Sequence, residues 1–200
     1  MSTQYPYIVG ITGASGAVYG IRLVQELLRA KHEVHLVLTE AAWQVFKAEM
    51  NLDTTDREAL LDSLFKDRRQ ALHIHDLHNY AAPIASGSFR TEGMIVIPCS
   101  MGSLSGMAAG ASGNLIERAA DVMLKEHRKL VIVPRETPLH QIQLENMLKL
   151  SKAGAIILPA MPGFYHSPQS LDDLILFVVG KALDSLGVDH ELFKRWGTES

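Results

Sequence analysis

A short stretch near the N-terminus combines two glycines with a hydroxyl and the start of a helical pattern. Gly13 and Gly16 enclose Ala14 and Ser15, directly after the apolar run Tyr7–Ile11. Glycines permit a tight turn and a close approach of the backbone, and the first N–H groups of a helix attract anions. We therefore expect this segment to bind a phosphate group. The alternative is an ordinary turn between a strand and a capped helix.

A cation and a carboxylate, Arg135 and Glu136, follow the apolar run Leu130–Val133. Thr137 and Pro138 are typical of an N-cap and a first-turn proline, so the charged pair precedes the next helix. A surface ion pair is the simplest interpretation, and such pairs contribute little to stability. The position after a strand favours a function instead: Arg135 for binding an anion and Glu136 for proton transfer.

Two segments are rich in small and hydroxyl-bearing residues, 83–88 and 98–110. We interpret both as loops whose backbone lies against a flat ligand. Cys99 lies at the start of the second loop. We interpret it as a buried, inert thiol rather than a nucleophile, because no neighbouring residue is placed to activate it.

Other polar residues have ordinary explanations. Thr39 and Glu40 begin a helical segment. We interpret Thr39 as its N-cap and Glu40 as a favourable acid in its first turn. The alternative for Glu40 is a contact with a ribose, as in dinucleotide-binding folds. Thr39 also remains open as a ligand contact. His73, His75 and His78 suggest a metal site, but no Cys, Asp or Glu pattern completes one, so we interpret them as surface or loop histidines.

A stiff loop with three prolines, 159–168, presents Phe164 and Tyr165 after the last apolar run. Lys181 lies sixteen residues beyond Tyr165 on the following helical segment. From its surroundings in the sequence, Lys181 is a solvated helix charge. Together these segments predict a site for a phosphorylated, planar cofactor, with a carboxylate and several cations nearby.

The candidate site residues lie between two kinds of predicted element, short strands and longer helices, which alternate along the chain. Short apolar runs predict strands at Tyr7–Ile11, Val34–Leu38, Met94–Ile97, Leu130–Val133 and Ala155–Leu158. Helical spacing predicts helices at Ala17–Ala30, Ala41–Met50, Arg57–Phe65, Asn114–Glu126, Leu139–Lys152 and Leu171–Leu186. Strands and helices in alternation indicate a single three-layer α/β/α domain over residues 1–200, with a mostly parallel sheet and a tail from about 190. Ligands of such sheets bind beyond the carboxyl ends of the strands.

The bulk composition excludes several classes of function. A formal net charge of -3 without a basic stripe argues against nucleic acid as a partner. A membrane helix needs about 18 uninterrupted apolar residues, and the sequence has no such stretch. The polar start of the chain is unlike a secretory signal. One cysteine among 200 residues cannot form an internal disulfide. We therefore expect a cytoplasmic protein.

Five separated motifs resemble the UbiX/Pad family of flavin prenyltransferases. They are Gly10–Gly16, Ala82–Ser88, Pro98–Leu104, Pro134–Leu139 and Pro159–Tyr165, joined by the Glu117–Asp121 stretch of the Asn114–Leu124 segment. The resemblance covers nearly the whole chain. It implies a flavodoxin/Rossmann-like flavoprotein fold, FMN rather than a dinucleotide, and a homo-oligomer, typically a dodecamer.

The resemblance also implies roles for individual residues. FMN contacts are Gly13, Ala14, Ser15, Thr39, Ser100, Met101, Gly102, Ser103 and Arg135. Dimethylallyl phosphate contacts are Ser86, Arg118, Lys125, Tyr165 and Lys181, some of them from a neighbouring subunit. The catalytic group comprises Glu136 as proton relay, Ser15 near flavin N5, Tyr165 and Lys181.

The implied reaction uses reduced FMN as a substrate and no metal. Flavin N5 attacks the allylic carbon first, and closure at C6 makes a fourth ring. Prenylated FMN then serves a UbiD-type decarboxylase of aromatic or unsaturated acids. In most prenyl transfers a metal neutralises the leaving group, and in this family protein cations replace it.

Two rival functions remain open. An FMN-dependent decarboxylase of cysteine-type thiols has a similar fold. Its loop after the last strand carries an asparagine that 159–165 lacks, but His73 and His75 lie in the right region for its central histidine. A non-catalytic flavin carrier needs the same cofactor contacts, but gives no purpose to Glu136, Tyr165 and Lys181.

Overall fold

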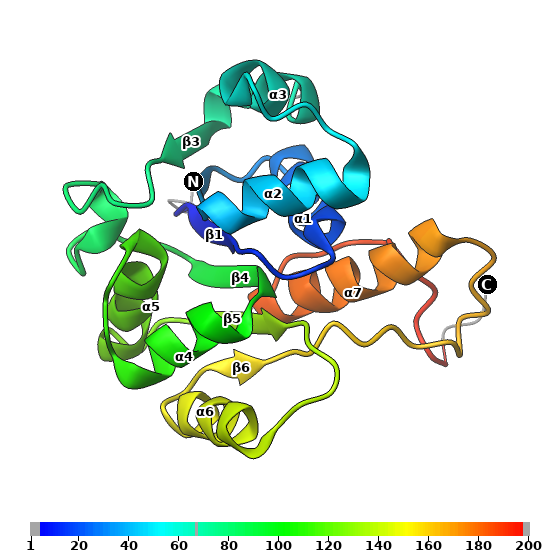
Figure 1. Ribbon diagram of the computed structural model, residues 1–200. Coiled ribbons are helices and arrows are strands. Elements are labelled where there is room, and N and C mark those ends of the chain that lie inside the picture. Colours follow the sequence, from blue (N-terminus) through cyan, green and yellow to red (C-terminus); the bar gives the residue numbers. More distant parts are fainter. Residues whose placement is uncertain (1–4, 67, 198–200) are drawn as a thin grey trace.

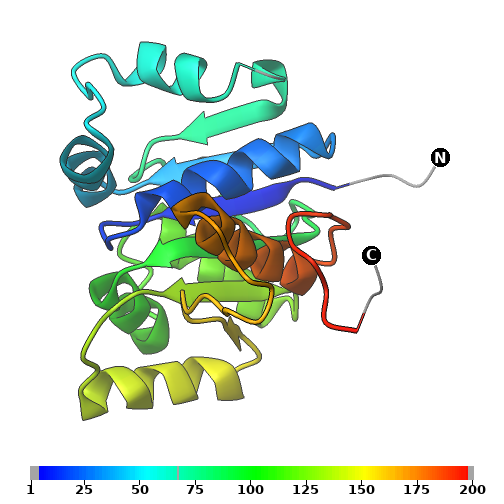
Figure 2. The ribbon, with the colours of Figure 1, turned by 90° about the vertical axis from the view of Figure 1, so that its right-hand side faces the viewer.

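A computed structural model describes residues 5–66 and 68–197, and in it six strands form one sheet in the order β3-β2-β1-β4-β5-β6. Every neighbouring pair is parallel. The strands run side by side in one direction across the molecule (Figure 1, Figure 2). Their bounds are β1 Tyr7–Ile11, β2 Val34–Leu38, β3 Leu72–His75, β4 Gly93–Cys99, β5 Leu130–Pro134 and β6 Ile156–Ile157.

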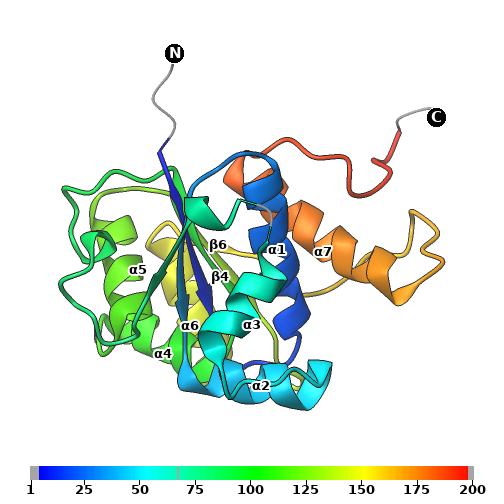
Figure 3. The same cartoon turned by 90° about the horizontal axis from the view of Figure 1, so that it is seen from above.

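Helices cover both faces of the sheet, as Figure 3 shows with the sheet seen nearly edge-on. One layer contains α1 Ala17–Arg29, α2 Glu40–Met50, α3 Arg57–Leu64 and α7 Leu171–Leu186. The other contains α4 Met101–Ala109, α5 Leu115–Lys125 and α6 Gln141–Lys152. Two short 3-10 turns, η1 Arg69–Ala71 and η2 Pro83–Ala85, lie in the connections. The three-layer α/β/α prediction is therefore confirmed.

The strand order decides between the two related folds that the sequence predicts together. Order 3-2-1-4-5-6 is that of the Rossmann fold, whereas flavodoxin has 2-1-3-4-5. The order reverses between β1 and β4, which are hydrogen-bonded neighbours. Loops that leave the carboxyl ends of these two strands diverge to opposite faces, and the crevice between them is where such folds bind ligands.

Strand β3 is absent from the sequence prediction, and the reason lies in its residues. Its four residues alternate Leu72 and Ile74 with His73 and His75, so it lacks the continuous apolar run that marks β1 and β4. It lies at the sheet edge and pairs only with β2 in the described part. His73 and His75 therefore lie in a strand and not in a loop, although His73 is exposed as the surface interpretation predicts; His78 is exposed and follows the strand.

The segment predicted as a loop over 98–110 is also wrong in part, because most of it is helix α4. Ser100 is its N-cap, and Gly110 ends it in the left-handed region. Its small residues let neighbouring elements approach closely: a Cβ on Gly106 would lie 2.3 Å from the Glu117 carboxylate of α5. Sparse large apolar residues hid the helical period.

The start of α6 also differs from the prediction. The N-cap is His140, whose backbone N–H donates to the Gln143 side chain at 3.1 Å. Thr137 does not cap the helix, because its hydroxyl donates to the carbonyl of Glu136 at 2.8 Å. Residues 135–140 therefore form a longer loop beside the carboxyl end of β5.

After α7 the chain has no further helix or strand up to residue 197, and the last three residues of the predicted tail lie outside the described range. This segment is not detached, because the Phe193 ring packs 5.0 Å from Phe177 of α7. Among the described residues, no helix is long and apolar enough to cross a bilayer.

Candidate functional site at the carboxyl edge of the sheet

A buried threonine joins the ends of the two strands at the switch point. The Thr12 hydroxyl donates to the carbonyl of Pro98 at 2.8 Å and accepts the backbone N–H of Ser100 at 2.7 Å. The N–H of Thr39 donates to the carbonyl of Ile11 at 3.1 Å. These bonds hold the residues that follow β1, β2 and β4 in one place, so the predicted FMN contacts from three separate motifs do meet.

The N-terminus of α4 is the best anion site of this edge. Ser100 accepts the N–H of Ser103 at 3.3 Å, and the two hydroxyls are 3.1 Å apart. A Cβ added to Gly102 would meet no atom within 4 Å, so the space in front of this turn is open. Two hydroxyls and the positive end of a helix dipole attract a negatively charged ligand.

The turn after β1 packs tightly against the start of α2. A Cβ on Gly13 would lie 2.3 Å from the Cβ of Ala41, so glycine is required there. Gly16 has φ 93°, a left-handed conformation that also favours glycine. Ser15 follows Gly13 in this turn and is half-buried. The tight turn expected from the glycines is confirmed.

A carboxylate from α2 takes the N–H groups that we expected to hold a phosphate. Glu49 Oε2 accepts the N–H of Gly16 at 2.8 Å and that of Ala17 at 3.4 Å. A phosphate at this helix start has to compete with Glu49, which sequence reasoning missed. One signal was available: an acid in the last turn of a helix opposes the helix dipole, so Glu49 needs a partner elsewhere.

Thr39 is confirmed as the N-cap of α2, because its hydroxyl accepts the N–H of Ala42 at 3.2 Å. Glu40 lies in the first turn and pairs with Arg57 at 2.7 Å. The hydrogen bond from Arg57 lowers the pKa of Glu40. The interpretation of Glu40 as a first-turn acid is confirmed.

Arg135 and Glu136 lie side by side at the end of β5 but do not pair. The backbone N–H of Arg135 donates to the carbonyl of Cys99 at 3.3 Å. The side-chain Nε of Arg135 is buried and has no hydrogen-bond partner within residues 5–66 and 68–197. Glu136 is exposed and accepts the N–H of Thr137 at 3.0 Å. The simple ion pair is therefore wrong, and a buried guanidinium N–H without a partner indicates a ligand.

The thiol of Cys99 lies behind this site. Its side chain is fully buried, and burial raises the pKa of the Cys99 thiol well above its ordinary value. A thiol that stays protonated is a poor nucleophile. The inert interpretation is confirmed.

A second group of the predicted residues surrounds η2. Arg118 of α5 donates to the carbonyl of Ala85 at 3.1 Å, which places it beside Ser86. Lys125, at the end of the same helix, pairs with Glu126 at 3.2 Å. No hydrogen bond or ion pair between described residues connects this group with Arg135. One chain therefore presents the predicted site in separate parts.

Comparisons with known proteins decide the family. A model of the family described as Flavoprotein matches residues 1–182. The flavin prenyltransferase UbiX of Alkalihalophilus pseudofirmus is 75% identical over 189 residues, which cover 94% of each chain. The chain belongs to the UbiX family.

Two solved structures of the UbiX family superpose closely. The crystal structure of AnUbiX in complex with FMN and dimethylallyl pyrophosphate has a TM-score of 0.89 and 41% identity, covering 99% of this chain and 100% of that chain. A dodecameric FMN-dependent UbiX-like decarboxylase from Escherichia coli O157:H7 has a TM-score of 0.86 and 44% identity, covering 96% and 100%. The whole domain therefore has the family's fold.

The last two residues that the UbiX resemblance selects lie on the α7 side of the sheet. The Tyr165 ring packs edge-on against Phe177, 5.6 Å between centroids. Lys181 is one helical turn beyond Phe177 and lies 3.6 Å from Asp184. Lys181 is thus paired as well as partly solvated, and the stiff loop holds Tyr165 near the same stretch of α7.

Proposed function

We propose that this chain is a flavin prenyltransferase, which transfers a dimethylallyl group from dimethylallyl phosphate to reduced FMN. The observation that carries the proposal is the buried Arg135 Nε, which has no hydrogen-bond partner among the described residues, next to the exposed carboxylate of Glu136 at the end of β5. Such a guanidinium is suited to an anionic ligand, and such a carboxylate to proton transfer. The 75% identity to a flavin prenyltransferase supports the same reading.

The residues at the carboxyl edge fit FMN. The open α4 N-terminus and Arg135 supply donors for an anion, while the turn at Gly13 and Ser15 brings backbone close to a flat ring. Reduced FMN supplies two electron-rich ring positions, N5 and C6, that form the new bonds to carbon. The proposed contacts are Gly13, Ala14, Ser15, Thr39, Ser100, Met101, Gly102, Ser103 and Arg135.

Protein cations take the place of a metal in this proposal. Arg135 and Lys181, with Arg118 and Lys125, neutralise the phosphate as the allylic C–O bond breaks. When the fourth ring closes, the prenyl double bond takes up a proton, its tertiary carbon bonds to C6, and C6 loses its own proton; Glu136 relays these protons. Tyr165 closes the pocket beside Lys181, and Ser86 completes the phosphate contacts.

We also propose that the chain works as a homo-oligomer, with the dodecamer of its Escherichia coli relative as the expected form. Separate groups of substrate contacts in one chain support this, because a neighbouring subunit can bring them together. The product then passes to a UbiD-type decarboxylase. The single, buried cysteine supports a reducing, cytoplasmic setting.

The decisive test is mass spectrometry of the flavin after anaerobic incubation with reduced FMN and dimethylallyl phosphate, with a chelator present. We expect a flavin heavier by one C5H8 unit. Dimethylallyl pyrophosphate in a parallel reaction shows which leaving group is preferred. Unchanged FMN in a folded, flavin-loaded protein contradicts the proposal.

Two variants assign roles within the same assay. We expect Glu136→Gln and Lys181→Ala to keep FMN but lose at least about 100-fold in prenyl transfer, the usual contribution of a proton-transfer group or a positioned charge. Glu58→Gln of α3 and Lys47→Ala of α2, at exposed positions outside the proposed contacts, are matched controls with full activity. Full activity in Glu136→Gln or Lys181→Ala removes that residue from the mechanism.

One of the two histidines that kept the rival thiol decarboxylase open lies away from the flavin site. His73 pairs with Glu33 at 2.8 Å. Glu33 directly precedes the first residue of β2, so this pair lies at the amino edge of the sheet. The FMN contacts lie at the opposite edge. His73 is therefore not placed to act on a flavin-bound substrate in the same chain.

A further inference from the structure

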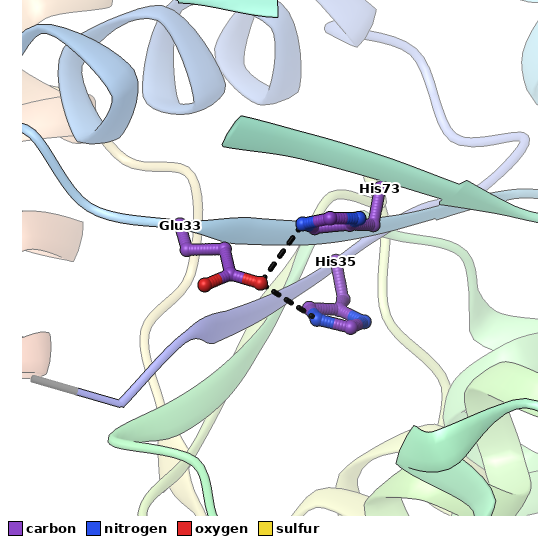
Figure 4. A group of neighbouring side chains, drawn as sticks. All are labelled: Glu33, His35 and His73. Atoms are coloured by element: carbon purple, nitrogen blue, oxygen red, sulfur yellow. Dashed lines mark ion pairs between the residues drawn. The ribbon is translucent and has the colours of Figure 1, made fainter. Parts of the chain in front are cut away.

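Two histidines and a carboxylate converge near the amino end of β2 (Figure 4). Glu33 directly precedes β2, and His35 is two residues further along the same face. His73 of β3 lies directly opposite His35 in the strand register. Glu33 Oε1 is 2.8 Å from His73 Nε2 and 3.6 Å from His35 Nε2.

His35 is the most constrained member of this group. Its side chain is 6% exposed, and Nε2 has no hydrogen-bond partner within the part of the chain that the structure describes. The other ring nitrogen, Nδ1, lies 2.8 Å from Nε2 of His75, and Phe89 packs 5.0 Å away. When Nδ1–H donates to His75, the lone pair of Nε2 faces Glu33 and His73. A buried nitrogen without a partner requires an explanation.

We propose that Glu33, His35 and His73 bind a divalent transition-metal ion of the zinc class. Tetrahedral zinc takes imidazole nitrogens and carboxylate oxygens at about 2.0–2.2 Å, which puts neighbouring ligand atoms about 3.3 Å apart. One ligand atom from each of the three residues lies within 4.8 Å of the others. Small side-chain rotations therefore reach the required geometry. Water takes the fourth position, since Glu33 and His73 are half-exposed.

The hydrogen bond between His35 and His75 has the form expected behind a metal ligand. A ligating histidine usually donates its second ring N–H to an acceptor, which fixes the ring and selects the tautomer. His75 Nε2 is such an acceptor at 2.8 Å. Lys31 and Arg68 line the same surface depression as Glu33 and His73, so the charge of Glu33 is needed to make the site attractive to a cation.

This site is distinct from the flavin site. Glu33 lies before the first residue of β2, whereas Thr39, a proposed FMN contact, follows its last residue. A metal here connects edge strand β3 to β2 and takes no part in prenyl transfer. The sequence alone does not bring these ligands together, because they come from two segments about 40 residues apart and one of the two strands was not predicted.

The test is a titration of the untagged, full-length chain with Co²⁺, followed by its visible absorption bands, and competition with Zn²⁺. We expect one equivalent per chain with the intense bands of tetrahedral cobalt. We expect Glu33→Gln and His73→Gln to weaken binding more than about tenfold, and His75→Ala to weaken it about 10- to 100-fold by freeing the His35 ring. His78→Gln, an exposed histidine beyond β3, is the matched control and keeps full affinity.

Retained FMN binding shows that each variant is folded, because the flavin contacts lie at the other edge of the sheet. Absence of a one-to-one cobalt complex in the wild-type chain overturns the proposal. So does a complex that survives both Glu33→Gln and His73→Gln, since the metal then binds elsewhere. A rise in Tm with Zn²⁺ in the wild type and its loss in His73→Gln support it.

Discussion

At the scale of single residues, Glu49 joins the end of one helix to the start of another. Its carboxylate accepts the N–H groups of Gly16 and Ala17, which would otherwise have only water as a partner. We expect Glu49→Ala to lower the free energy of unfolding by about 1 kcal/mol, as does loss of an N-cap. Glu49→Gln keeps an acceptor but loses the charge, and should cost about half as much.

Urea unfolding of the FMN-free chain measures these differences. Lys47→Ala, two residues earlier on the exposed side of α2, is the matched control and is expected to change stability little. Equal unfolding free energies for Glu49→Ala and Lys47→Ala would show that the contact contributes nothing. Thr12 and Glu49 both form hydrogen bonds with residues more than 30 positions away in the sequence. The local sequence therefore could not predict the partner of either side chain.

At the scale of elements, the predictable parts are those whose residues are buried on two faces. Strands β1 and β2 match their predicted bounds because each residue in them is buried, which favours apolar side chains: β1 is apolar throughout, and only the buried His35 interrupts the apolar run of β2. Helix α7 also matches, since Ser170 caps it and Gly187 ends it. Strand β3 and helix α4 were missed because neither has a clear apolar pattern of its own: β3 alternates apolar residues with histidines, and α4 consists mostly of small residues. A site assembled from loop ends could be located, but its contacts could not.

The N-terminus of α7 gives the prediction at this scale. Asp173 Oδ2 accepts the N–H of Gln169 at 2.7 Å and that of Ser170 at 3.0 Å. The hydrogen bond from Gln169 lowers the pKa of Asp173 below its ordinary value. A lowered pKa gives stability that is fully present above the unfolded-state pKa, about 3.9, and is lost as pH falls through the folded-state pKa.

We therefore expect Asp173→Asn to lower the Tm at neutral pH and to approach the wild type as the pH falls below about 4. Thermal melts of the FMN-free chain across this range check the prediction. Glu191→Gln, an exposed carboxylate outside the helices, is the control and should leave the Tm difference near zero at all pH values. A wild-type advantage that grows on acidification would contradict the assignment.

At the scale of the whole molecule, one chain does not complete the proposed site. Arg118 and Lys125 lie on the α5 side of the sheet, whereas Tyr165 and Lys181 lie with α7 on the other. Large apolar side chains are exposed at the same time, among them Leu144 and Leu148 of α6 at 50% and 55%. They lie one turn apart on one face of the helix. Exposed apolar faces of this kind mark interfaces, and we expect a neighbouring subunit to cover this face and to complete the site.

Replacing these two leucines tests whether assembly and activity depend on each other. We expect Leu144→Lys/Leu148→Lys to form smaller species than the wild type, because two charges cannot be buried in an interface without partners. Native mass spectrometry measures the assembly, and flavin mass spectrometry measures prenyl transfer, which should fall with it. Gln44→Lys adds the same kind of charge at an exposed position of α2 and controls for charge alone. A double variant with wild-type mass shows that α6 lies outside the interface. Smaller species with full activity would show instead that one chain holds every group the reaction needs.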